Sequence, residues 1–186
     1  MIRMVKDLFY SRFLLALIIV LIILPAGFAE ASVRDPYKHF FSETFGDFQE
    51  ELDNAREQGK LGVLIFFEMD DCPFCHRMKQ MVLNQSKVQT YFKQHFLNFS
   101  VDTKGDLEVV DFAGDSYTQK DFALKKNRVR ATPVFAIYDL EGNMIARYTG
   151  ATSGIDEFLL LGEFIVSGAY QDLRFSQYKR QHLVKK

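Results

Sequence analysis

The sequence of 186 residues contains no tryptophan, only two cysteines and almost no net charge, at a formal value of −1. Two cysteines are too few for a closed structural zinc site, which needs four ligands, and the histidines that could complete one are widely scattered along the chain. The small net charge gives no indication of nucleic-acid binding. Phenylalanine is abundant instead, with 19 residues, and predicts a core filled largely by Phe side chains.

A long hydrophobic run occurs at the N-terminus. The twelve apolar residues 13–24 follow a segment with three Arg or Lys side chains and precede a proline and an Ala-Glu-Ala sequence. These are the three parts of a secretory signal peptide, so we expect residues 1–31 to be cleaved after Ala29 or Ala31 and the protein to be exported, most simply to a bacterial periplasm. The alternative is an uncleaved inner-membrane anchor, because residues 13–29 carry no charge.

The two cysteines form the motif Cys72-Pro73-Phe74-Cys75, directly after the apolar run 62–67. If a helix begins at the proline, Cys72 is its N-cap and Pro73 its first residue, with Phe74 completing the turn that leads to Cys75. Both sulfurs then lie on one side of the helix, whose free N–H groups and dipole stabilise a thiolate at Cys72. The motif predicts a redox-active disulfide in which Cys72 is the nucleophile and Cys75 the resolving thiol.

Two other uses of the cysteine pair are a structural disulfide and a metal site. A structural disulfide that closes so short a loop would stabilise the domain little. A copper-handling thiol module is the second alternative, because thiolates attract Cu(I) and the thioethers of Met69, Met78 and Met81 are close in sequence. We expect the pair to work as a redox site, with no metal and no cofactor.

Hydrophobic periodicity predicts alternating helices and strands along the chain. The expected elements are one long or two short helices in 37–58, a buried strand at 62–68, helices at 73–83 and from a Ser86 cap to about 95, strands at 96–102, 131–139 and 144–149, and a helix at 153–168. A hairpin joins the last two strands. This order predicts an α/β domain with a mixed sheet in residues 32–168, followed by a basic, solvated extension in residues 169–186.

The order of these features resembles the thioredoxin superfamily. A strand, the C-P-x-C motif and a helix are followed some sixty residues later by Thr132-Pro133, then by a hairpin and a closing helix. The resemblance covers about residues 45–168 and implies a thioredoxin-like fold, with a central mixed β-sheet flanked by helices. Within the superfamily, Cys75-His76-Arg77-Met78 makes the chain most similar to exported thioredoxin-related proteins of the SoxW type.

The resemblance also implies roles for individual residues. Pro133 would follow a cis peptide bond, and Thr132 would offer backbone hydrogen bonds to an extended substrate segment. The implied activity is that of a cell-envelope thiol–disulfide oxidoreductase that reduces protein disulfides, acts as a monomer and receives electrons from a separate membrane thiol-donor protein. The alternatives are a disulfide-forming oxidase or isomerase, and a thioredoxin-fold interaction domain without catalysis.

One departure from the family concerns proton transfer. Thioredoxins bury an aspartate in the strand before the motif, and Phe66 stands at that position here. Proton transfer would then rely on water or on another carboxylate, and Glu68, Asp70 and Asp71 are the nearest in sequence. Close to Cys72, these acids would raise its pKa by like-charge repulsion, whereas His76 or Arg77 could lower it. We therefore regard Glu68, Asp71 and His76 as candidate modulators of the thiol pKa.

Overall fold

The computed structural model describes residues 33–183, so the expected signal peptide lies outside the described residues. The helices and strands, in chain order, are α2 Pro36–His39, α3 Phe48–Glu57, β1 Gly62–Glu68, α4 Pro73–Met78, the π-helix η1 Lys79–Leu83, α5 Ser86–His95, β2 Phe96–Asp102, β3 Glu108–Val110, β4 Ser116–Thr118, α6 Gln119–Asp121, the π-helix η2 Phe122–Lys126, β5 Val134–Tyr138, β6 Met144–Thr149, α7 Ile155–Val166, the 3-10 helix η3 Ala169–Gln171 and α8 Phe175–Leu183.

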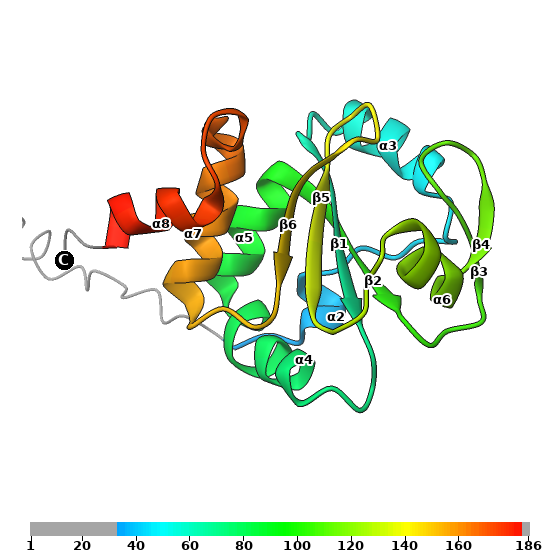
Figure 1. Ribbon diagram of the computed structural model, residues 1–186, viewed down its shortest axis with the longest axis horizontal. Coiled ribbons are helices and arrows are strands. Elements are labelled where there is room, and N and C mark those ends of the chain that lie inside the picture. The colour runs from blue at the N-terminus through cyan, green and yellow to red at the C-terminus, as the bar shows by residue number, and fades with distance from the viewer. Residues whose placement is uncertain (1–32, 184–186) are drawn as a thin grey trace, which may run out of the picture. The chain divides into compact units, whose positions relative to one another are not determined.

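A four-stranded mixed sheet in the order β2-β1-β5-β6 forms the centre of the domain. β1 runs parallel to β2 and antiparallel to β5, and β5 and β6 form the expected hairpin. Helices α5 and α7 lie on one side of the sheet, and α3 and α6 lie on the other (Figure 1). The predicted α/β fold with a mixed sheet flanked by helices is confirmed.

The core consists of two apolar layers separated by the sheet. Successive residues of a strand point to opposite faces. Leu64 and Phe66 therefore belong to the layer shared with α4, α5 and α7, whereas Val63, Ile65 and Phe67 belong to the layer shared with α3 and η2. Most of the largest fully buried side chains are phenylalanines, which confirms the Phe-filled core.

Of the two possibilities predicted for 37–58, the structure has the two short helices, α2, which begins one residue earlier, and α3. The second helix starts anew because the Asp47 side chain accepts hydrogen bonds from the N–H groups of Gln49 and Glu50. The prediction that Ser86 caps α5 is wrong. Gln85 is the N-cap residue, and no side chain caps that helix end.

The stretch between β2 and β5 contains structure that the periodicity did not predict. β3 and β4 form a small antiparallel hairpin, and α6 continues into η2. Asp111 is fully buried in this region, where its Oδ1 accepts hydrogen bonds from the N–H groups of Ala113 and Asp115, and Lys126 Nζ lies 2.5 Å from its Oδ2. The ion pair joins η2 to the hairpin loop across 15 residues of sequence, beyond the range of a local pattern.

The C-terminal segment is a packed helix and not the solvated extension that we expected. In α8, the ring of Tyr178 lies 5.2 Å from that of Phe164 in α7. Next to it, Lys179 Nζ lies 2.5 Å from Oε1 of Glu157, a carboxylate only 4% exposed. None of the helices within residues 33–183 combines the length and hydrophobicity needed to cross a bilayer.

The Glu157–Lys179 pair predicts how α8 contributes to stability. Burial raises the pKa of Glu157, but hydrogen bonds from Lys179 and Ser153 outweigh burial and lower this pKa from 4.5 to about 2. A carboxyl whose pKa falls on folding stabilises the folded state above its ordinary pKa, and this contribution is lost as the pH falls towards the folded value.

We expect Lys179→Met to lower the free energy of unfolding at neutral pH by about 1–3 kcal/mol, because the buried carboxylate loses its charged donor. Urea unfolding should show this loss shrinking as the pH falls from 4.5 to about 2, the window set by the Glu157 pKa. Lys179→Arg keeps the charge and serves as the control. A loss of equal size at every pH would contradict the ion-pair explanation.

Candidate active site

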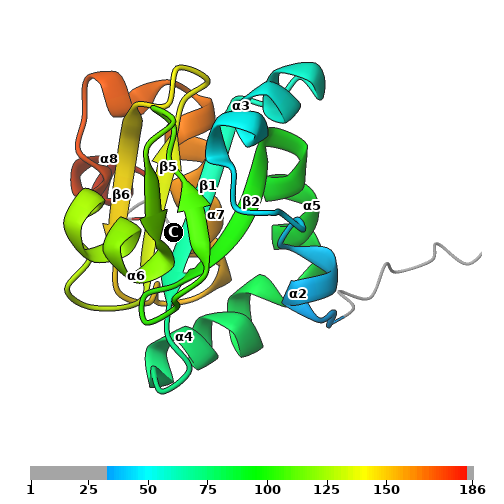
Figure 2. The same ribbon diagram turned by 90° about the vertical axis from the view of Figure 1, so that its right-hand side faces the viewer.

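The cysteine pair lies at the start of α4, after the short loop 69–71 that follows β1. Figure 2 shows α4 at one end of the sheet. Cys72 is the N-cap of α4 and Pro73 is its first residue, as the motif predicts. Cys72 and Cys75 are joined by a disulfide, with their Cα atoms 5.2 Å apart, and both side chains are buried. The structure therefore describes the oxidised state of the pair.

Local hydrogen bonds favour negative charge on one sulfur. The N–H of Cys75 lies 3.1 Å from Sγ of Cys72 and points to it, so it would stabilise a thiolate there after reduction. Between the cysteines, the Phe74 side chain is 57% exposed and offers an apolar contact surface beside the disulfide. The hydrogen bond from the Cys75 N–H favours negative charge on the Cys72 sulfur, which agrees with Cys72 as the attacking sulfur.

The Thr132–Pro133 peptide bond is cis, as the resemblance implies. Val134 pairs with Phe67 in the sheet, so Pro133 lies next to the last residue of β1, at the end of the sheet from which the chain continues to Cys72. Thr132 Oγ1 is buried and has no hydrogen-bond partner among the described residues. Two segments far apart in sequence, the cysteine motif and the cis-proline loop, thus lie at the same end of the sheet.

Two of the acids before the motif, Glu68 and Asp71, are paired with lysines. Glu68 is only 5% exposed, and its Oε2 lies 2.5 Å from Lys79 Nζ. Asp71 is exposed, and Lys104 Nζ lies 2.9 Å from each of its carboxylate oxygens. Hydrogen bonding to Lys104 holds the pKa of Asp71 below its ordinary value. The repulsion that we expected from these two acids is therefore offset by a positive charge in each case.

The two remaining expectations concern Phe66 and His76. Phe66 is fully buried between the rings of Phe41 and Phe135, so no acid lies at this point of β1. His76 is exposed, and its Nε2 lies 2.6 Å from the carbonyl oxygen of Asp70, which ties the ring to the loop before the cysteines. Its side chain therefore supports this loop.

Sequence reasoning missed the lysines on which the site electrostatics depend. Lys79 follows Cys75 by four residues, so its position on the same helix face was a signal available from spacing. Lys104 follows Asp71 by 33 residues, and no local pattern joins the two. Tyr37 and Ser100, which also bind Glu68, come from α2 and β2 and were equally hidden.

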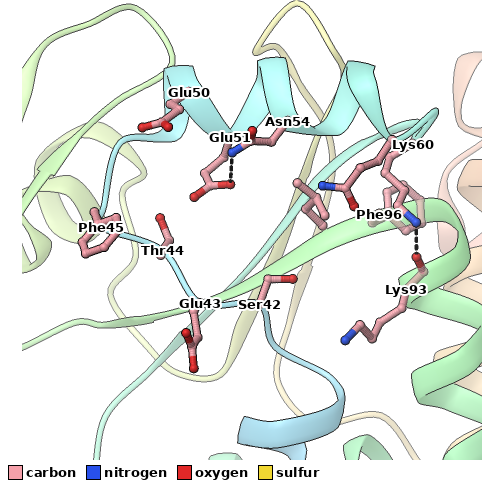
Figure 3. Close-up of a pocket in the computed structure, with 12 residues that line it drawn as sticks. Ser42, Glu43, Thr44, Phe45, Glu50, Glu51, Asn54, Lys60, Lys93 and Phe96 are labelled. Carbon is pink, nitrogen blue, oxygen red and sulfur yellow. Dashed lines mark hydrogen bonds between the residues drawn. The ribbon is translucent and has the colours of Figure 1, made fainter.

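A large hollow elsewhere on the domain does not include the cysteines. It has a volume of about 800 Å³ and lies between α3, the segment before it and the end of α5 (Figure 3). Its lining includes Glu43, Phe45, Glu50, Lys60 and Lys93, but no residue of the cysteine motif or the cis-proline loop. The chemistry of the cysteine pair therefore does not take place in this hollow.

The Asp71–Lys104 pair predicts an effect on the adjacent cysteine. We expect Lys104→Gln to raise the pKa of the Cys72 thiol by less than about one unit, because Asp71 then loses its partner but stays exposed to water. The rate of Cys72 alkylation by iodoacetamide against pH, in the reduced protein, measures this shift. The shift should vanish at high salt, and Lys120→Gln, at another exposed lysine, is the control. An unchanged pKa at low salt would contradict the prediction.

The chain is similar to known proteins of one family. Residues 48–165 match the family model described as a thioredoxin-like domain. A thioredoxin-fold protein from Helicobacter pylori matches with a TM-score of 0.56 and 23% identity, over 69% of this chain and 88% of that one. A search of curated proteins finds no significant match.

Two further solved structures share the fold. A thioredoxin from Thermus thermophilus matches with a TM-score of 0.50 and 22% identity, over 63% of this chain and 82% of that one. A protein described as DsbH oxidoreductase matches with a TM-score of 0.50 and 20% identity, over 80% of this chain and 96% of that one. These structures support the fold, and the family match together with the paired Cys72 and Cys75 supports thiol–disulfide redox activity in general terms. Because the family match spans more than half of its length, the chain belongs to the thioredoxin-like domain family.

Proposed function

We propose that this protein is an exported thiol–disulfide oxidoreductase that reduces protein disulfides through Cys72 and Cys75. One observation carries the proposal: the Cys72–Cys75 disulfide at the start of α4, with the N–H of Cys75 directed at Cys72 Sγ. This arrangement favours a thiolate at Cys72 and keeps the second sulfur within bonding distance. It is what a reversible dithiol–disulfide pair requires.

The reaction follows from this geometry. In the reduced protein, the Cys72 thiolate attacks one sulfur of a substrate disulfide, forms a mixed disulfide and releases the other substrate sulfur as a thiolate. Cys75 then loses its proton to water or to that thiolate and attacks Cys72 Sγ. The Cys72–Cys75 bond forms, the mixed disulfide breaks, and the substrate has gained two electrons.

The substrate would bind beside the cis-proline loop. We propose that the backbone of Thr132 pairs with an extended substrate segment, and that Pro133 holds the Thr132 backbone at the end of β1. The position of Val134 opposite Phe67 supports this role, because it places the loop at the end of the sheet that precedes Cys72. The exposed ring of Phe74 would contact apolar residues that flank a substrate cysteine.

The finer classification is also a proposal. Cys75-His76-Arg77-Met78 favours the SoxW type of exported thioredoxin-related protein, acting as a monomer in the bacterial periplasm. The segment 1–31 would direct this export. Turnover in an oxidising compartment needs a dithiol donor that returns two electrons to the Cys72–Cys75 disulfide, and a membrane protein that carries electrons outward would serve as that partner.

Reduction of insulin disulfides tests the activity. With dithiothreitol as the electron source, we expect the protein to accelerate insulin precipitation and Cys72→Ser to abolish this acceleration, because the attacking sulfur is lost. Cys75→Ser should instead accumulate a mixed disulfide with the substrate, visible by mass spectrometry. Precipitation no faster than with dithiothreitol alone would overturn the proposed reductase.

The reduction potential tests the direction of electron flow. Reductants of this kind have potentials near about −270 mV and strong oxidants near about −120 mV. We expect equilibration of the Cys72–Cys75 pair with glutathione buffers, followed by alkylation and mass spectrometry, to give a value near the reductant end. A value near the oxidant end would assign the protein to disulfide formation instead.

A further inference from the structure

The carboxylate of Glu68 lies on the same side of the sheet as the cysteines. Glu68 is the last residue of β1, and alternation along the strand places it on the face that carries Leu64 and Phe66. That face packs against the layer that contains Cys72 and Cys75. Burying a charged group destabilises the folded state unless the group is paired and hydrogen-bonded, so the Glu68 carboxylate requires partners.

Lys79 connects the Glu68 carboxylate to α4, the helix that begins at the cysteines. Its Nζ lies 2.5 Å from Glu68 Oε2, and its side chain is only 12% exposed. The backbone N–H of Lys79 donates to the carbonyl oxygen of Cys75, one helical turn earlier. Side chains four residues apart on a helix are neighbours, with about 5–6 Å between their Cβ atoms. Lys79 therefore follows the resolving cysteine on the same face of the helix.

The other partners of Glu68 keep the pair in place. Glu68 Oε1 accepts hydrogen bonds from the hydroxyl groups of Tyr37, at 2.9 Å, and Ser100, at 2.6 Å. Lys79 Nζ also donates to the Tyr37 oxygen at 2.7 Å. Three donors thus surround the carboxylate of Glu68, which accepts hydrogen bonds from all of them. The network connects α2, β1, β2 and α4, the helix that begins at the cysteines.

The charge on Lys79 is held by the same contacts. Burial lowers the pKa of Lys79, but the hydrogen bonds to Glu68 and Tyr37 outweigh burial and keep this pKa above its ordinary value. Other ionisable side chains near the motif are more exposed: Asp71 is paired with Lys104 at the surface, and His76 and Arg77 are exposed. Lys79, four residues after Cys75 on the helix, and Glu68, its partner, therefore carry the poorly solvated charges of this region, and solvent screens them least.

We propose that Glu68 and Lys79 form a charge pair that controls the ionisation of Cys75, in which Lys79 favours the thiolate and Glu68 opposes it. The assignment of Cys75 as the resolving thiol rests on the proposed function. In that step Cys75 releases a proton to water or to the departing substrate thiolate before it attacks Cys72. Lys79 and Glu68 act as positioning residues through their charges and exchange no proton or electron.

The thiol pKa of Cys75 tests this proposal directly. In a Cys72→Ala background Cys75 is the only thiol, and the ultraviolet absorbance of its thiolate against pH gives its pKa. We expect Lys79→Met to raise this pKa by about half a unit or more, because Glu68 then stands alone. Glu68→Gln should lower it by a similar amount, because Lys79 then stands alone. The double variant should return towards the parent value.

The controls separate charge from structure. Lys79→Arg keeps the charge and should keep the pKa, and Lys87→Met removes the lysine of the exposed Lys87–Asp156 pair and should also leave it unchanged. A purely structural role predicts shifts in the same direction for Lys79→Met and Glu68→Gln, or none, and either result would overturn the proposal. Circular dichroism verifies that each variant is folded.

The measurement needs no turnover, so its outcome is independent of the insulin assay. Opposite pKa shifts in a protein that fails to reduce insulin would leave the charge pair established and reject the proposed reductase. Normal insulin reduction without opposite pKa shifts would support the proposed reductase and reject the charge pair.

Discussion

Strand β1 is buried on both faces, and its position determines where the reactive groups of the domain lie. All seven of its residues are buried, between one apolar layer shared with α5 and α7 and another shared with α3 and η2. A one-residue shift in register would move every side chain of this strand to the opposite layer and disrupt the packing of both layers. The loop after β1 therefore places Cys72 at a fixed position, and the pairing of β5 with β1 places Pro133 at the same end of the sheet.

Electrostatics at this end of the sheet follow from the same constraint. Because Glu68 terminates β1, its carboxylate is held in a poorly solvated position and is stabilised by Lys79 and two hydroxyl groups. Asp71, only three residues later, is exposed to solvent and pairs there with Lys104, which is also exposed. Two acids that look alike in sequence thus differ in solvation, and interactions of the buried one are screened far less.

Local patterns predicted much of the fold. The strands at 62–68, 96–102 and 144–149 have the predicted limits, because each is an apolar or alternating run bounded by turn residues. The capping of α5 and the packing of α8 were not predictable in this way. Gln85 is an N-cap without side-chain capping, and α8 is held by the contact of Tyr178 with Phe164 and by Lys179 with Glu157. These contacts join residues that no local period relates.

The candidate site divides along the same line. The sequence by itself determined that α4 starts at Pro73 with Cys72 as its N-cap, and that β1 carries an apolar side chain at position 66. Both features depend on neighbours within one helical turn or one strand. Only the tertiary structure decided that Glu68 is bound by Lys79, Tyr37 and Ser100, and that Asp71 is matched by Lys104. The charge around a thiol depends on through-space distance and burial, and both arise only when distant segments pack together.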